Sequence, residues 1–171
     1  MILIAGLIFR AVAIEFRSKQ ESPKWRSFWD VIFFISSVVT GVVIGIALGN
    51  LMIGVPLTET QDYYGSFWDL LNLYALLVGA MGMSLFAMHG AIYLTMKTEG
   101  ETQEIVRYWI GRAIAVFVFF YLVTTAATMI YVPRMTHQME KYPIFLALPI
   151  LAFVSIFSIP YLVRRKTDGL A

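Results

Sequence analysis

The chain alternates long apolar runs with short segments that carry most of its charged residues. Four of the runs hold about 20 residues or more, which at about 1.5 Å per residue is enough to cross a hydrocarbon core of about 30 Å. They are Val31–Val55, Leu70–Met96, Ala113–Val132 and Tyr142–Val163. A fifth run, Met1–Ile14, is shorter and contains Arg10. We expect a truncated helix there, and therefore a chain that lacks the start of a longer protein.

This pattern predicts an all-α integral membrane protein, a bundle of one truncated and four complete transmembrane helices. The helices are expected at about 1–19, 30–55, 67–96, 107–132 and 142–164. No loop is long enough to fold as a soluble domain, so residues 1–171 are expected to form a single membrane domain, itself part of a larger bundle. A hydrophobic content of 59% agrees, because it leaves too little polar surface to cover a water-soluble globule.

The Lys and Arg residues fall mainly on alternate loops. Ten lie in the segments 15–29, 97–112 and 164–171, against two in the intervening loops, Arg134 and Lys141. Because cytoplasmic loops retain positive charge, the three basic segments are predicted to be cytoplasmic. The net charge of +2 is dispersed over helix ends, where lipid headgroups are nearer than any nucleic acid. The chain has no Cys, so it holds no disulfide, thiolate metal site or iron–sulfur cluster of its own.

Small residues recur at helical spacing in two of the runs. One ladder is Gly41, Gly45 and Gly49, and a similar one is Gly79, Gly82 and Ser84. Such ladders let helix backbones approach closely, so we predict packing seams. The alternative is that the glycines line a cofactor or permeation path. In the last run, Pro149 and Pro160 are each expected to kink the helix.

Few polar residues near the membrane are candidates for chemistry. Glu15, Ser18 and Lys19 follow one another at i, i+3 and i+4, which places a carboxylate, a hydroxyl and an ammonium on one helix face. This row predicts either a proton relay at the cytoplasmic end or a surface ion pair. Arg10, about a turn before the boundary, is either an anchor that reaches the headgroups or part of a buried ion pair.

His89 lies deep in an otherwise uncharged run. Its imidazole could relay a proton, ligate a haem or hydrogen-bond a facing helix. Asn50, Asp69 and Asn72 lie near the outer helix ends, where they are expected to form a polar cluster facing the outside, and Asn50 and Asn72 serve either structure or quinone binding. The other histidine, His137, lies in an outer loop, so two histidines of this chain are not expected to hold a haem together.

The stretch FRAVAIEFRSK at 9–19, followed by KWRSFWD at 24–30, resembles subunit II of the cytochrome bd-type quinol oxidases of bacteria. The likeness continues through the segments 44–56, 70–72 and 89–101. Members of this family carry further helices on both sides of the matched stretch, so the resemblance implies that this chain is the central part of a subunit.

The resemblance also implies a function. Complexes of this family oxidise quinol and reduce dioxygen to water in the bacterial cell membrane. Haems b and d lie in the partner, subunit I, so this chain is expected to bind no haem or metal, although a structural quinone occurs in some members. Subunit II supports the heterodimer and contributes a cytoplasmic proton path at positions matching Glu15, Ser18, Lys19 and Arg10. The alternatives are a fragment of a secondary transporter, with broken helices at Pro149 and Pro160, and a purely structural membrane protein.

Overall fold

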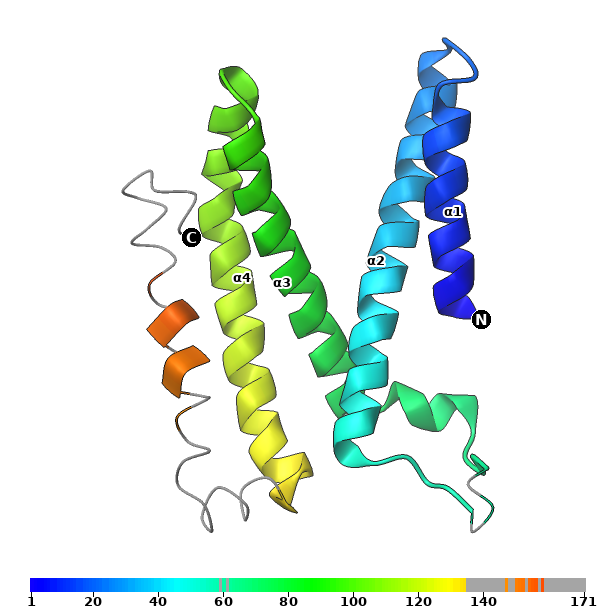
Figure 1. The fold of residues 1–171 in the computed structure, drawn as a ribbon, viewed down its shortest axis with the longest axis vertical. Helices are drawn as coiled ribbons and strands as arrows, with labels where there is room; N and C mark the ends of the chain where they lie inside the picture. Colours follow the sequence, from blue (N-terminus) through cyan, green and yellow to red (C-terminus); the bar gives the residue numbers. More distant parts are fainter. Residues whose placement is uncertain are drawn as a thin grey trace. The chain divides into compact units, whose positions relative to one another are not determined.

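The computed structural model describes residues 1–58, 60, 62–134, 147, 150–152, 154–156 and 158. Its main elements are α1 (Ile2–Arg17), α2 (Pro23–Ile53), the 3-10 helix η1 (Phe67–Leu71), α3 (Leu73–Lys97) and α4 (Glu101–Tyr131) (Figure 1). Among the described residues, α2, α3 and α4 are long and apolar enough to cross a membrane. The predicted all-helical membrane bundle is confirmed to that extent. The helix predicted at 142–164, with its two prolines, lies mostly outside the described residues.

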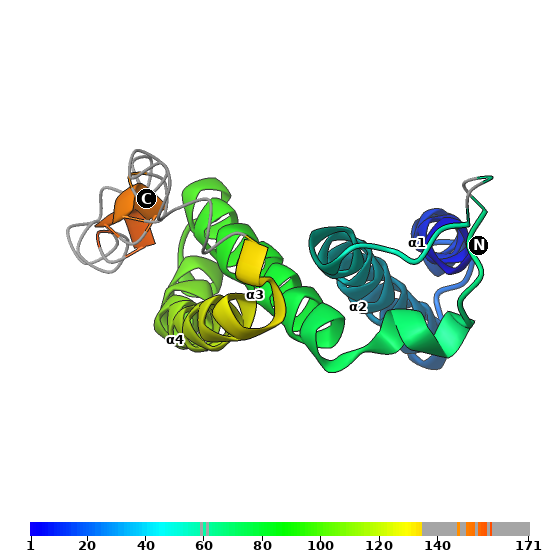
Figure 2. The same ribbon diagram turned by 90° about the horizontal axis from the view of Figure 1, so that it is seen from below.

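The chain divides into two compact units, residues 1–83 and residues 84–171. In the first unit, α1 and α2 run antiparallel along each other (Figures 1 and 2). In the second unit, the later part of α3 runs antiparallel to α4 (Figure 1). Whether residues 1–171 act as one membrane domain stays a prediction.

Two helices begin about two turns before the predicted starts at 30 and 107. Pro23 stands in the first turn of α2, where its fixed φ suits a helix and its missing N–H is not needed. In α4, Glu101 and Glu104 occupy the first turn after Gly100, whose φ is 67°. Hydropathy marks only the part of a helix that lies in hydrocarbon. Both helices continue beyond that part, because their polar first turns keep the same backbone hydrogen bonds.

The third predicted helix, expected from 67, is broken near its start. Ser66 and Asp69 form a reciprocal capping box around η1, and the Ser66 N–H donates to Asp69 Oδ2 at 2.7 Å. Asn72 then has extended backbone, and its Oδ1 accepts from the Ala75 N–H at 2.8 Å. This is the geometry of a helix N-cap, so α3 starts afresh at Leu73.

The predicted glycine seam is confirmed as a packing seam in the first unit. A Cβ added to Gly45 would lie 2.5 Å from Gly79 Cα, and one added to Gly49 would lie 2.7 Å from Ala75 Cα. Backbone of α3 therefore occupies the space that larger side chains would need. At these positions the glycines serve helix contact and line no path. On the other side of α2, Gly6 of α1 packs against a side chain instead of backbone, since a Cβ added there would lie 2.5 Å from Thr40 Oγ1.

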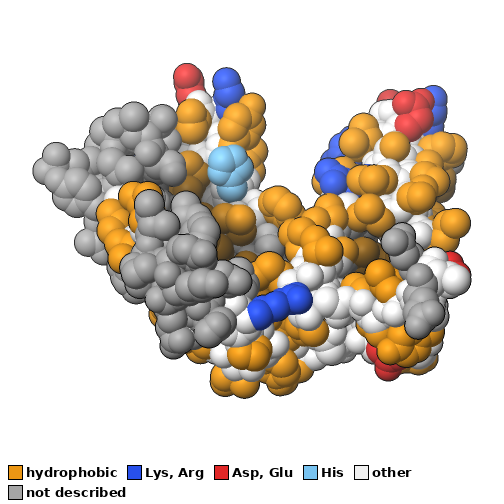
Figure 3. Space-filling model, turned by 60° about the horizontal axis from the view of Figure 1, so that its bottom comes forward, with side chains coloured by type: hydrophobic (Ala, Val, Ile, Leu, Met, Phe, Trp, Pro, Cys, Tyr) orange, Lys and Arg blue, Asp and Glu red, His pale blue; other side chains and the backbone are white. Residues whose placement is uncertain are grey.

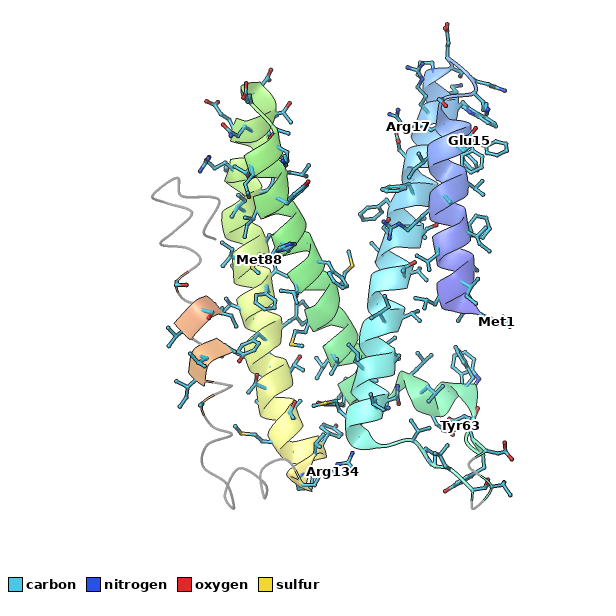
Figure 4. The ribbon with its side chains drawn as sticks, viewed as in Figure 1. Met1, Glu15, Arg17, Tyr63, Met88 and Arg134 are labelled. Atoms are coloured by element: carbon cyan, nitrogen blue, oxygen red, sulfur yellow. The ribbon has the colours of Figure 1, made fainter. Side chains whose placement is uncertain are left out.

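The core of the second unit comes from the facing sides of α3 and α4. Met88, Ile92 and Thr95 are buried on α3, and Ile110 and Ile114 are buried on α4 (Figure 4 labels Met88). The Gln103 side chain donates to the Thr95 carbonyl oxygen at 2.8 Å and links the two helices near their turn. Many large hydrophobic side chains stay exposed on the surface (Figure 3). This is the surface expected of helices that meet lipid or other helices.

Candidate functional site

The turn between α1 and α2 is held by an ion pair. Arg17, at the last residue of α1, donates through Nε to Asp30 Oδ1 at 2.6 Å and through Nη2 to Asp30 Oδ2 at 3.3 Å. The hydrogen bond and the charge of Asp30 raise the pKa of Arg17 above its usual range. This bidentate contact, called the clamp below, joins the last residue of α1 to α2 at a point about two turns after Pro23.

Aromatic rings reinforce this clamp. The Trp29 ring lies 5.4 Å from Phe16, 5.7 Å from Trp25 and 5.4 Å from Phe28, measured between centroids. The Trp25 indole Nε1 donates to the Phe16 carbonyl oxygen at 2.8 Å. That carbonyl belongs to the last turn of α1 and also accepts the Lys19 N–H at 3.1 Å. The ion pair and the rings together fix the geometry of the turn.

The candidate relay residues are only partly brought together. Lys19 Nζ lies 2.9 Å from Glu15 Oε1, while the Ser18 hydroxyl donates to the main-chain carbonyl of Glu15 at 3.2 Å and not to its carboxylate. Arg10 lies elsewhere, with its guanidinium 5.6 Å from the centre of the Phe33 ring on α2. Both Glu15 and Arg17 lie near the turn (Figure 4). They are about 200° apart around the helix axis, so the Glu15–Lys19 pair lies on the side of α1 away from the clamp.

A pocket of about 340 Å³ lies beside the clamp, lined by residues that include Arg17, Ser18, Trp29 and Asp30. The Trp29 Nε1 atom is buried and has no hydrogen-bond partner among the described residues. A buried donor without a partner is costly, and a water molecule bound in a polar pocket satisfies such a donor. The rest of the lining is apolar, from Ala13, Ile14 and Phe33, so the polar part of the pocket is confined to Arg17, Ser18 and Asp30 near the end of α1.

The predicted cluster of Asn50 and Asn72 forms, and its donors are engaged. The Asn50 amide nitrogen donates to the Ile46 carbonyl at 2.9 Å and to the Leu70 carbonyl at 2.7 Å. Asn72 donates to Asn50 Oδ1 at 2.9 Å and to the Asp69 carbonyl at 3.3 Å. Asn50 is buried, and the network ties η1 and the start of α3 to the end of α2.

His89 has an exposed side chain on α3 and makes no hydrogen bond to any part of the chain that the structure describes. No group of three metal-ligating side chains comes together in the described ranges. His137 lies outside those ranges.

Two arrangements were missed at the sequence level. Arg17 and Asp30 are 13 residues apart, and only the turn between their helices makes them neighbours. In α4, Arg112 lies 4.6 Å from the Tyr108 ring centre and 4.7 Å from the Trp109 ring centre, and its Nη2 donates to the Tyr108 hydroxyl at 2.7 Å. This contact could have been predicted from the sequence, because Arg112 follows Trp109 by three residues and Tyr108 by four, which places the three side chains on one helix face.

Comparison with known families gives a match over the whole chain. The family model described as cytochrome bd terminal oxidase subunit II matches residues 1–171. The chain belongs to this family. The predicted family is thereby confirmed, together with the expected placement in a membrane.

Individual relatives agree with this assignment. The chain is 42% identical over 105 residues to the cytochrome bd-I ubiquinol oxidase subunit 2 of Escherichia coli K12. The aligned stretch covers 59% of this chain and 28% of that protein. The chain is 28% identical over 169 residues to the cytochrome bd ubiquinol oxidase subunit 2 of Bacillus subtilis. This alignment covers 99% of this chain and 49% of that protein. A probable cytochrome oxidase subunit 2 of Haemophilus influenzae is 43% identical over 103 residues, covering 57% of this chain and 27% of that protein. The chain thus spans half or less of the length of these relatives.

Proposed function

We propose that this chain acts as part of the haem-free subunit II of a bd-type quinol oxidase. In this proposal it assembles with subunit I, which carries haems b and d, and the complex oxidises quinol and reduces dioxygen to water. The observation that carries the proposal is the subunit II family match over residues 1–171. The names of the relatives, which are ubiquinol oxidase subunits, support the substrate class.

The second part of the proposal is that the α1–α2 turn admits protons from the cytoplasm. The turn lies within 15–29, one of the three basic segments, which favours the cytoplasmic side. Glu15 is exposed near it, paired with Lys19, and can take a proton from water and pass it on. Ser18, one turn after Glu15, lines the pocket on the clamp side of α1, whose volume of about 340 Å³ has room for several waters at about 30 Å³ each.

Arg10 takes a supporting part in this proposal. It contacts Phe33 of α2 and so helps to hold α1 in register with its neighbour. Asn50 and Asn72 hold the other end of α2, and since their amide donors are engaged we assign them a structural role. A structural quinone is retained in the proposal as a ligand of the complex, without an assigned residue.

The oxidase proposal is tested by deleting the gene for the complete subunit in the native host. Membranes without the subunit are expected to lose bd-type quinol-driven oxygen uptake and the haem d absorbance, and re-expression is expected to restore both. Unchanged uptake and absorbance in the deletion strain would overturn the proposal.

Glu15→Gln tests the relay, because the amide keeps the shape of the side chain but cannot carry a proton. Turnover and proton uptake by the purified complex are expected to fall together by about 100-fold or more, the range typical of losing one proton-transfer group. The haem spectra are expected to stay unchanged. Glu21→Gln is the matched control, since Glu21 is an exposed carboxylate in the same turn. Equal turnover in the two variants would reduce Glu15 to an ion-pair partner.

A further inference from the structure

An apolar pocket of about 410 Å³ lies among η1, the later part of α2 and the first turn of α1, which contributes Ile2. Its walls include Val43, Ile46 and Ala47 of α2, with Phe67 and Leu70 of η1. The short helix η1 lies across the end of α2 and not along it (Figure 1). The volume falls in the range of about 300–1,000 Å³ that is usual for pockets that bind small ligands.

The depth of this pocket matches one leaflet of a bilayer. Val43 stands ten residues before Ile53, the last residue of α2. At about 1.5 Å per residue Val43 lies about 15 Å from the end of α2, half of a hydrocarbon core of about 30 Å, and the α2 residues in the lining, from Val43 to Asn50, cover about 10 Å of helix. With the end of α2 at the membrane surface, the deepest lining residue would lie near the midplane, within the space that a lipid tail occupies.

The segment over this pocket has the character of a membrane interface. Tyr64, Phe67 and Trp68 are 69%, 52% and 74% exposed. Exposed aromatic rings beside a membrane-spanning helix prefer the headgroup level, where one edge meets water and the other meets hydrocarbon. The loop from Pro56 to Asp69 contains no Lys or Arg. It therefore offers no positive charge to bind an anionic headgroup, while its three acidic residues would repel one, and so it favours a zwitterionic headgroup.

The polar residues of the lining have no donor left for a polar ligand. Tyr63 donates its hydroxyl to the Ser66 carbonyl at 2.7 Å, and the Asn50 amide donates to the Ile46 and Leu70 carbonyls. A quinone ring placed in the pocket would find no free side-chain donor for its carbonyl oxygens among these lining residues, which is unfavourable in an apolar site. A hydrocarbon chain needs no donor and gains from burial against the apolar wall.

We propose that this pocket binds an acyl chain of a zwitterionic membrane phospholipid, with the headgroup beside the aromatic residues of η1. The lipid would fill the space under η1 and hold this helix against the membrane surface. The proposal does not rest on the oxidase function, because it follows from the shape, depth and engaged donors of the pocket.

The test uses the tagged full-length protein in its native membrane, with its partners present. The probe is a phosphatidylethanolamine that carries a photoactivatable diazirine in the middle of one acyl chain. Cross-linked peptides identified by mass spectrometry are expected from α2 around Val43–Asn50 and from η1. Ala47→Phe fills the pocket and is expected to lower this cross-linking several-fold, because Ala47 lines the pocket and is itself exposed to it.

Leu48→Phe is the matched control, since Leu48 stands next in the same helix, is 54% exposed and does not line the pocket. It is expected to leave the cross-linking unchanged. If Ala47→Phe does not accumulate in the membrane, Ala47→Leu fills part of the same space and makes the same test. The proposal is overturned if the pocket variants label as strongly as the parent protein, or if excess ubiquinone removes the label. It is also overturned if the parent protein gives no label at α2 and η1, which is the result expected when protein fills the pocket.

Discussion

At the scale of single residues, the firmest contact at the proposed proton-entry end joins Arg17 and Asp30. Both side chains are about half exposed, at 53% and 52%, so water and salt weaken their attraction. The pair therefore acts mainly through geometry, since two parallel hydrogen bonds fix the angle at which α1 meets α2.

Arg17→Gln is expected to lower the thermal unfolding temperature of the purified complex slightly, and the difference from the parent is expected to shrink as salt rises. Because the pKa of Arg17 is raised above its usual range, its contribution is complete below that range and is lost only as pH rises through the raised pKa. The difference is therefore expected to be the same at pH 6 and pH 9. Arg26→Gln, at another exposed arginine of the same region, is the control. A difference that changes steeply between pH 6 and pH 9 would show that another group sets it.

Asn50 is a buried polar residue whose side chain makes three hydrogen bonds, so its replacement is expected to affect stability. Asn50→Ala removes the donor to the Leu70 carbonyl and the acceptor for Asn72, so unfolding is expected to become easier by about 1–3 kcal/mol. The measurement is unfolding of the detergent-solubilised complex, followed by circular dichroism.

Asn72→Ala and the double variant complete this test. Since the two side chains share one hydrogen bond, the effect of the double variant is expected to be smaller than the sum of the single effects. Strict additivity would mean that the two asparagines act independently.

At the scale of elements, the close contact of α2 with α3 depends on glycine. Gly45→Ala would place a methyl group 2.5 Å from Gly79 Cα and 2.9 Å from the Val78 carbonyl oxygen, so backbone must shift. We expect a loss of about 1–3 kcal/mol, as for other overpacked sites. The matched control is Gly90→Ala in α3, where an added methyl group meets nothing within 4 Å. That variant is expected to be neutral or more stable by up to about 1 kcal/mol, because Ala favours helix over Gly.

Thermal unfolding of the two variants side by side measures this prediction. Equal stability of Gly45→Ala and Gly90→Ala would show that the seam tolerates a wider separation of the helices.

The sequence predicted the apolar elements well and the contacts between elements poorly. Hydropathy located the runs that became α2, α3 and α4, because burial in hydrocarbon requires long apolar stretches. The Gly45 seam was also predictable, since small residues repeat at helical spacing. The break at Asn72 was not predicted, because that residue ends η1 through an extended backbone and a side-chain cap that hydropathy does not register. The Arg17–Asp30 clamp depends on which turn of each helix faces the other, and spacing along the chain does not show that.

At the scale of the whole molecule, the proposed function depends on which side of the membrane the α1–α2 turn faces. Helix α2 and helix α3 are both long and apolar enough to cross a membrane. If both cross, the turn at Ser22 and the turn at Glu99 face one side, and the loop at Tyr64 faces the other. The bias of Lys and Arg toward 15–29 and 97–112 then makes Ser22 and Glu99 cytoplasmic.

Single cysteines test this topology directly, since the chain has no Cys of its own. Ser22→Cys loses no capping hydrogen bond, because the Ser22 side chain makes none, and Tyr64→Cys and Glu99→Cys replace exposed side chains. A membrane-impermeant maleimide added to intact spheroplasts is expected to label Tyr64→Cys alone, and all three variants are expected to react after the membrane is opened. Labelling of Ser22→Cys and Tyr64→Cys from the same side would mean that α2 does not span the membrane. Labelling of Ser22→Cys and Glu99→Cys from outside, without Tyr64→Cys, would invert the protein. Glu15 would then lie on the side away from the cytoplasm, where it could not admit the protons that the proposed reaction consumes.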